Sequence, residues 1–176
     1  QACQELVPTL VAAGGMTPSE ARAIGRAASE RGFDTMAKRL GGDDPIAEIV
    51  KAAKADPSKA YRDFLQNASR YSKENQAMAW GVIGQFLAKK LDPNADDAYR
   101  LQQDLGFNEL LSVESQEWKV RAGLRAKDWV LVKNAIDGMN PAVRSKDPAW
   151  TYWYGRALKA EGQEAKARDS FEMIAD

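Results

Sequence analysis

The placement of prolines directly after Asp or Thr is the feature that most constrains what this sequence can fold into. An Asp or Thr directly precedes a proline at five places: Thr17-Pro18, Asp44-Pro45, Asp56-Pro57, Asp92-Pro93 and Asp147-Pro148. The side-chain oxygen of an N-cap residue accepts hydrogen bonds from free backbone N–H groups, and proline at the first helical position lacks an N–H that would stay unpaired anyway. Each pair therefore predicts a helix start, and Thr17 with Glu20 adds a reciprocal capping box.

The apolar residues between these marks follow a helical period. Ile46, Ile49 and Val50 fall at i, i+3 and i+4, and no segment alternates with period two over more than a few residues. We therefore expect no strands. Glycines are expected at helix ends: Gly14-Gly15, Gly32, Gly41-Gly42, Gly106 and Gly162. The predicted helices span residues 1–13, 18–31, 34–40, 45–55, 57–70, 73–91, 93–105, 115–127, 129–139, 148–161 and 163–176.

Short amphipathic helices of this kind are marginal alone and bury their apolar faces against neighbours. Short connections make neighbouring helices antiparallel, and hairpins stacked on one another form a helical solenoid. A weak repeat supports this arrangement, since Trp118-x-x-Arg121 recurs 35 residues later as Trp153-x-x-Arg156. The sequence therefore predicts an all-α fold, an α-superhelix of stacked antiparallel helix hairpins.

The last hairpin, residues 148–176, resembles a tetratricopeptide repeat. Gly155, Ala167 and Phe171 have the spacing of that repeat, in which small residues let two helices approach and an aromatic ring fills the gap. The earlier hairpins fit less well, so we describe the superhelix as degenerate and tetratricopeptide-like. We expect residues 1–176 to be a segment of one superhelical domain, with 118–176 as its best-matching hairpins.

The charge is uneven although the total is neutral, with 25 basic and 25 acidic side chains. Residues 118–168 carry 11 Lys or Arg and 5 Asp or Glu, a net charge of +6. Such a basic end can meet an anionic polymer, and the alternative is an ordinary solvated helix surface. The neutral total argues against nucleic acid as a partner.

The residue types for most catalytic and metal sites are missing from the sequence. There is no His, and Cys3 is the only cysteine, so a serine–histidine pair, a thiolate cluster and an internal disulfide are excluded. Asp96-Asp97 opens a predicted helix, where carboxylates complement the helix dipole. Glu114 lies near Trp118, but glutamate is common at a helix start. We therefore predict no catalytic residue, metal or cofactor.

Aromatic residues crowd the helix that follows Pro148. They are Trp150, Tyr152, Trp153 and Tyr154. One interpretation is packing between hairpins, because large aromatic side chains dominate helix interfaces. The alternative is a sugar-stacking or peptide-docking surface beside Arg156.

The chain has no apolar run approaching the roughly 20 residues of a membrane span, so we predict no such span. It opens on Gln1-Ala2-Cys3 and closes within a helical pattern, and we expect a fragment of a longer protein. Cys3 is then either a buried thiol or one half of a disulfide whose partner lies outside the chain.

Residues 118–171 carry a family resemblance. The pattern Trp118-x-x-Arg121-Ala-x-Leu124-x-x-x-Asp128-Trp129, followed by Asp147-Pro-x-Trp150-x-Tyr152-Trp153-x-x-Arg156-Ala-Leu-x-x-x-Gly162, resembles the superhelical U-shaped domain of soluble lytic murein transglycosylases. The rest of the chain fits the same domain more loosely. The acid/base glutamate of that family lies in a separate lysozyme-like domain, C-terminal to the superhelix, and its motifs are not complete here.

The resemblance implies a periplasmic bacterial protein whose parent cleaves peptidoglycan glycan strands to anhydromuramyl products. This segment would then be inactive and would steer glycan strands toward the C-terminal catalytic domain of the same parent chain. The candidate glycan contacts are Lys119, Arg125, Lys133, Trp150, Tyr152, Trp153 and Arg156. The resemblance also implies that Cys3 pairs with an upstream cysteine. Two other classes stay open: a tetratricopeptide-like adaptor for protein partners and, against the residue inventory, a self-sufficient enzyme.

Overall fold

The computed structural model describes residues 2–33, 35–37 and 44–175. Helices make up most of this part of the chain, and no strand occurs within it. The predicted all-α class is therefore confirmed. The superhelical and tetratricopeptide-like character of the stack stays a prediction.

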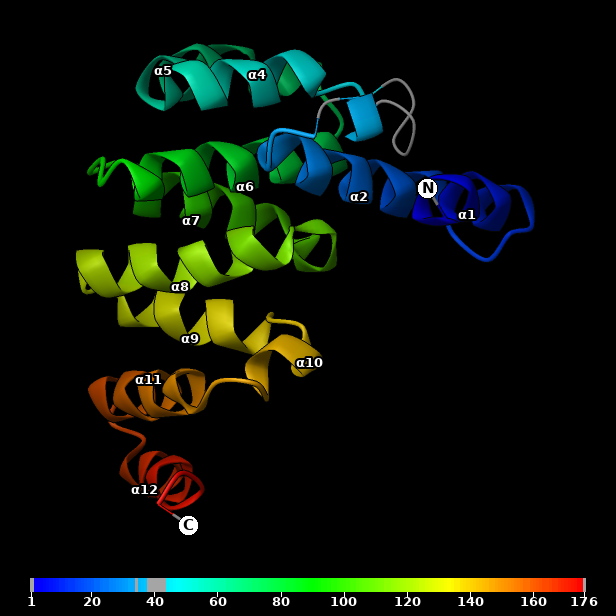
Figure 1. The fold of residues 1–176 in the computed structure, drawn as a ribbon. Helices are drawn as coiled ribbons and strands as arrows, with labels where there is room; N and C mark the ends of the chain where they lie inside the picture. The colour runs from blue at the N-terminus through cyan, green and yellow to red at the C-terminus, as the bar shows by residue number, and fades with distance from the viewer. Residues whose placement is uncertain (1, 34, 38–43, 176) are drawn as a thin grey trace.

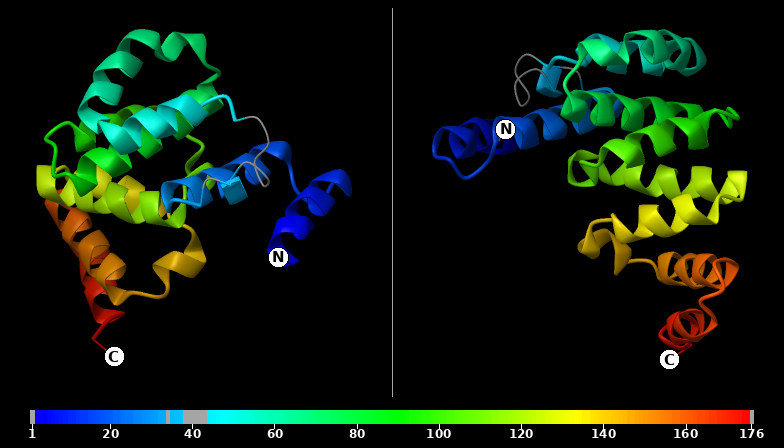
Figure 2. Two further views of the ribbon diagram at one scale, coloured as in Figure 1. Left: turned by 45° about the horizontal axis from the view of Figure 1, so that its top comes forward. Right: turned by 180° about the vertical axis from the view of Figure 1, so that it is seen from behind.

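Four antiparallel hairpins are piled one on another (Figure 1). In chain order their helices are α4 (Ala47–Ala55) with α5 (Pro57–Asn67), α6 (Lys73–Lys89) with α7 (Ala95–Leu105), α8 (Val113–Ala126) with α9 (Trp129–Asp137), and α11 (Pro148–Ala160) with α12 (Glu164–Glu172). The tight turns within the hairpins all lie along one side of the stack (Figures 1 and 2). We call this side the turn edge; its turns are residue 56 and residues 90–94, 127–128 and 161–163.

The connections between hairpins lie along the opposite side. They contain the 3-10 helices η1 (Ala68–Arg70) and η2 (Asn108–Leu110) and the short helix α10 (Pro141–Arg144). Helices α1 (Ala2–Ala12) and α2 (Pro18–Glu30) extend outward from this side as an arm (Figure 2). The two sides of the stack are therefore built differently, and only the turn edge is free of added elements.

The N-terminal caps explain where most helices begin. The capping box at Thr17 is formed, and Asp56 and Asp147 each accept a hydrogen bond from the backbone of the first turn, as predicted. The predicted starts after Asp44 and Asp92 are two residues early. Each of these carboxylates accepts a hydrogen bond from the second residue after it, which closes a turn before the helix begins.

Several helix ends differ from the predicted ones. Gly14, Gly32, Gly106 and Gly162 have positive φ, as expected for glycine after a helix. Leu91, Phe107 and Lys127 also adopt positive φ, which the sequence did not indicate. Of the helix predicted over 34–40, residues 35–37 are helical and the others lie outside the described residues, as do Gly41 and Gly42.

Within the described residues the core consists of three clusters of buried apolar side chains, a large one centred on α4 to α7, a second shared by α8, α9 and α11, and a small one between α1 and α2. Helix α6 lies between the first and third hairpins, and eleven of its residues are buried on several faces. Small residues allow the closest approaches: a Cβ on Gly84 would lie 3.0 Å from the ring of Tyr99 in α7. In the last hairpin a Cβ on Gly155 would lie 2.7 Å from the Phe171 ring. The predicted fit of Phe171 against a small residue is thus confirmed.

Candidate functional site on the turn edge

Lys119 is buried inside the stack and cannot contact a glycan strand. Its side chain is 2% exposed, and its ammonium donates hydrogen bonds to amide oxygens of Gln102 at 2.7 Å and Asn108 at 3.0 Å, and to Gln103. The prediction that Lys119 contacts glycan is therefore wrong, because this face of α8 packs on α7 and on the α7–α8 connection. Burial away from any carboxylate partner lowers the pKa of Lys119 to about 7.

The two other predicted basic contacts differ from each other. Lys133 is half-buried and forms a 2.6 Å ion pair with Glu161, which connects α9 to the end of α11 and raises the pKa of Lys133. Arg125 is exposed near the C-terminal end of α8 and has no ion-pair partner within the described part of the chain. Arg125 therefore keeps a charge that is available to an anion, as does Lys127 in the following turn.

The predicted aromatic residues divide between core and surface. Trp150 is 6% exposed and belongs to the cluster between the α8–α9 and α11–α12 hairpins, so a surface role for it is wrong and the packing interpretation holds. Trp153 is half-buried against the same cluster. Tyr152 and Arg156 are exposed. The sequence could not separate these residues, because which face of α11 is covered depends on where α9 lies.

Two arginine–aromatic stacks connect successive hairpins. The Arg121 guanidinium lies 5.1 Å from the Trp118 ring centroid and 5.6 Å from that of Trp150. The Arg156 guanidinium lies 6.0 Å from the Trp129 ring and 5.9 Å from the Tyr152 ring. A guanidinium at such distances is attracted to the negative face of an aromatic ring. Arg121 and Arg156 are both exposed in these stacks.

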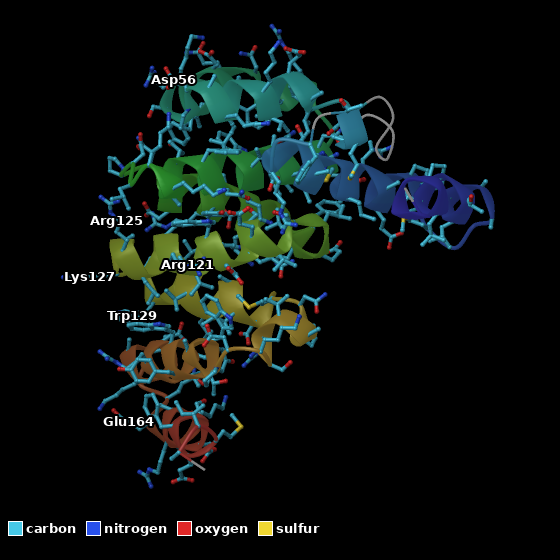
Figure 3. The ribbon with its side chains drawn as sticks, in the orientation of Figure 1. Asp56, Arg121, Arg125, Lys127, Trp129 and Glu164 are labelled. Carbon is cyan, nitrogen blue, oxygen red and sulfur yellow. The ribbon has the colours of Figure 1, made fainter. Side chains whose placement is uncertain are left out.

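Figure 3 shows how these residues follow the turn edge. The labelled side chains run from Asp56 in the first hairpin, past Arg125, Arg121, Lys127 and Trp129, to Glu164 in the last. Three exposed cations, Arg121, Arg125 and Lys127, lie where the α8–α9 hairpin reaches this edge.

A pocket of about 290 Å³ opens on the same edge, between the α6–α7 turn and the C-terminal half of α8. Its walls are largely apolar, and they include Leu91 and Trp118. Two arginines and two aspartates complete the lining: Arg121, Arg125, Asp92 and Asp96. Within α8, the spacing of Trp118, Arg121, Ala122 and Arg125 at i, i+3, i+4 and i+7 places them on one face. This spacing was the sequence signal that could have indicated the pocket.

The aspartates of the pocket are already paired. Partial burial acts to raise the pKa of Asp92, but hydrogen bonds from Ser58 and Asn94 outweigh it and lower that pKa. Asp96 accepts from Arg100 at 3.0 Å. Arg121 pairs with Glu117 at 3.3 Å, whereas Arg125 pairs with no carboxylate in the part of the chain described above. Because the hydrogen bonds to Asp92 come from neutral groups and lower its pKa, Asp92 stays ionised, and the formal charge of the pocket lining is zero.

Glu114, weighed above as a catalytic acid, and Glu30, a glutamate that the sequence did not single out, have other roles. Glu114 forms a 2.8 Å ion pair with Lys89, and the hydrogen bond from that lysine lowers the pKa of Glu114. Burial does raise the pKa of Glu30 on α2, where the Ser112 hydroxyl donates to it at 2.9 Å. The cavity beside Glu30 has a volume of about 10 Å³, which is room for one water molecule and not for a sugar. Neither glutamate therefore faces a space that a glycan could enter.

No family model matches this chain, and no curated protein matches it either. None of the described helices is long and apolar enough to cross a membrane. Within the same residues, no group of His, Cys, Asp and Glu has an arrangement that could hold a metal ion. The side chain of Cys3, the predicted disulfide partner of a residue outside the chain, lies outside the described residues.

Proposed function

We propose that this chain is a non-catalytic helical segment of a periplasmic soluble lytic murein transglycosylase, and that it binds peptidoglycan glycan strands along its turn edge. The family proposal comes from the sequence resemblance over residues 118–171. The observation that carries the binding proposal is the unpaired positive charge of Arg125 and Lys127 beside the pocket and the two arginine–aromatic stacks.

The shape of this surface suits a long polymer better than a small substrate. Arg125, Lys127 and Trp129 follow one another along the edge (Figure 3), with the pocket at Arg125 and the Arg156 guanidinium over the Trp129 ring. Peptide stems on peptidoglycan carry carboxylates that unpaired cations attract, and such exposed pairs weaken as salt rises. In this proposal the segment holds and directs a strand whose cleavage takes place in the catalytic domain of the parent chain.

Co-sedimentation with purified peptidoglycan sacculi tests the proposal. The double variant Arg125→Glu/Lys127→Glu should lose most of the sedimented fraction at low salt, because it reverses both unpaired charges. The matched control is Arg70→Glu/Lys73→Glu, which makes the same charge change at exposed residues on the opposite side of the stack. Equal loss in both variants would indicate general charge attraction and would contradict binding at the turn edge.

A second candidate function is an adaptor for protein partners. The observation that favours it is the surface pairing of Arg156 with Trp129 and Tyr152, because Trp, Tyr and Arg are the residue types enriched at interface hot spots. An adaptor predicts that Tyr152→Ala/Arg156→Ala abolishes capture of a peptide while sacculus binding is absent from the unaltered chain. Release of anhydromuramyl products by this chain alone would contradict both proposals.

A further inference from the structure

The pocket on the turn edge carries opposite charges on its two walls. Its two aspartates belong to one wall, with Asp92 in the α6–α7 turn and Asp96 in the first turn of α7. Its two arginines, Arg121 and Arg125, belong to the other wall, which is α8. Among the described residues, no ion pair joins an aspartate of the pocket to an arginine of the pocket. The walls therefore complement a ligand with a positive group on one side and a negative group on the other.

The surface between the charged walls is apolar. Alanines from α6, α7 and α8 line it together with Leu91 and Trp118. Leu91 is 62% exposed, so the α6–α7 turn presents an apolar side chain to solvent beside the pocket. The volume of about 290 Å³ is at the lower end of the roughly 300–1,000 Å³ of small-molecule sites. The pocket therefore has room for one large apolar side chain.

This arrangement of charge favours a peptide over a free amino acid. In a free amino acid the amine and the carboxylate are attached to the same carbon atom, whereas the pocket has its carboxylates and its guanidiniums on different helices. In an extended peptide the side chains at i−2, i and i+2 point to the same face, with neighbours on that face roughly 7 Å apart. An apolar side chain at i can then enter the pocket while charged side chains on either side of it face the two walls.

The neutral lining decides what the charges contribute. A lining with two aspartates and two arginines has no net charge with which to attract a polyanion. Burial of the apolar side chain then supplies the affinity, and the charge pattern selects among sequences, because a like charge facing either wall is repelled. The exposed guanidiniums of α8 are suited to a carboxylate, which they bind through parallel hydrogen bonds.

We propose that this pocket binds a segment of a protein partner in which one large apolar residue lies between a basic residue and an acidic residue, each two positions away. The apolar side chain enters beside Leu91 and Trp118, the basic side chain faces Asp92, and the acidic side chain faces Arg125. This inference goes beyond the glycan binding proposed above and does not depend on it.

The test uses ¹H–¹⁵N spectra of the tryptophan indoles, with the Trp118 signal assigned from Trp118→Phe. The probes are peptides with blocked ends: Lys-Ser-Phe-Ser-Glu, the like-charged Glu-Ser-Phe-Ser-Glu and Lys-Ser-Phe-Ser-Lys, and Lys-Ser-Gly-Ser-Glu without the apolar side chain. We expect the first peptide to shift the Trp118 signal and to bind at least fivefold more tightly than either like-charged peptide. It should bind at least tenfold more tightly than the glycine peptide.

Variants of the two walls test which charge faces which group. Asp92→Asn should remove the preference for the first peptide over Glu-Ser-Phe-Ser-Glu, and Arg125→Gln should remove its preference over Lys-Ser-Phe-Ser-Lys. The matched controls Asp63→Asn and Arg70→Gln change exposed residues outside the pocket and should keep both preferences. The comparison of the four peptides on the unaltered chain holds even if Asp92→Asn disturbs the α6–α7 turn.

Several outcomes would overturn the inference. Equal affinity for the three phenylalanine peptides would exclude selection by charge, and an unmoved Trp118 signal at millimolar peptide would exclude binding in the pocket. Free phenylalanine that binds as tightly as the first peptide would exclude a peptide as the occupant. Sacculus sedimentation is scored separately: peptide binding at Trp118 without sacculus binding supports the inference and contradicts the proposed function, and the reverse result contradicts the inference alone.

Discussion

The hairpin α6–α7 and the hairpin α11–α12 are built alike and buried differently. In each, a glycine of the first helix faces an aromatic ring of the second, Gly84 with Tyr99 and Gly155 with Phe171. Tyr99 is fully buried and donates a hydrogen bond to the Ser115 carbonyl at 2.9 Å, because the next hairpin covers it. Phe171 is half-buried in the last helix of the described chain.

The difference shows that neighbours on both sides, more than the hairpin motif itself, set how deeply a hairpin is buried in this stack. Helix α6 is apolar or small over most of its length because it is covered by the hairpins on either side of it. In α12 the buried residues are Ala167 and Ser170. We therefore expect core substitutions to destabilise the interior hairpin α6–α7 strongly. The same kind of substitution in the last hairpin, α11–α12, should cost less, because α12 can shift locally.

Truncation of the interior core should have the largest effect. Leu87→Ala in α6 removes a side chain with 0% exposure, and we expect the free energy of unfolding to fall by about 2–5 kcal/mol. The matched control is Leu65→Ala in α5, where the leucine is 49% exposed and the expected loss is about 0.5 kcal/mol. Urea denaturation followed by circular dichroism measures both. Equal losses of unfolding free energy in Leu87→Ala and Leu65→Ala would contradict the burial of Leu87 inside the stack.

Overpacking of the two glycines compares the hairpins directly. Gly84→Val should destabilise the fold by about 3 kcal/mol, because the added methyl groups meet the fixed ring of Tyr99. Gly155→Val should cost about 1 kcal/mol, although its Cβ contact is shorter, because Phe171 and α12 can move outward. Thermal or urea unfolding of the two variants tests this order. A larger loss in Gly155→Val than in Gly84→Val would contradict the expectation that the last hairpin adjusts more easily than the interior one.

The buried amine of Lys119 gives the interior a pH dependence. Its pKa is about 7 in the folded state and about 10.4 when unfolded. Between these values the unfolded chain binds more protons, so stability rises with pH through this window and levels off below pH 7. We expect a gain on the order of 2 kcal/mol from pH 7 to pH 9. Urea titrations of Lys119→Met should show a flatter slope over this range, whereas Lys127→Met at the surface should keep the slope. If the slope of unfolding free energy against pH is unchanged in Lys119→Met, Lys119 is excluded as the cause of the pH dependence.

The ion pair between Lys133 and Glu161 should have the smallest effect. It joins α9 to the end of α11 at 2.6 Å, and both side chains are about a quarter exposed. A double-mutant cycle with Lys133→Met and Glu161→Gln should give a coupling energy of about 0.5 kcal/mol, which salt reduces. A coupling energy above about 2 kcal/mol would mean that the last hairpin is held mainly by charge rather than by its apolar layer.

The helices could be predicted from sequence where the signal is local. The Thr17 box, the Asp56 and Asp147 caps and the Gly155–Phe171 fit each depend on residues of one helix or one hairpin. The positive φ angles at Leu91 and Phe107 were not predicted, because leucine and phenylalanine rarely adopt the left-handed backbone conformation. Helix α10 was missed because it is a single turn capped by Asn140.

The site could be predicted only in part, because it depends on which helix face is covered. Lys119 and Arg125 lie on the same helix, yet one is buried under α7 and the other is exposed at the turn edge. Both are basic residues in one amphipathic segment, and the sequence does not state which face of that helix its neighbours cover. The pocket needs the α6–α7 turn to lie beside α8, and this proximity follows from the stacking of hairpins and from no local pattern.

Hydrogen–deuterium exchange of the chain with and without soluble peptidoglycan strands tests the central claim most directly. Glycan binding at the turn edge predicts slower exchange at the C-terminal end of α8, in the 127–128 turn and in the exposed part of α11. Residues 68–73, on the opposite side, should exchange at an unchanged rate. Slower exchange at 68–73 with no change around Arg125, or no change anywhere at a saturating concentration of strands, would contradict the account.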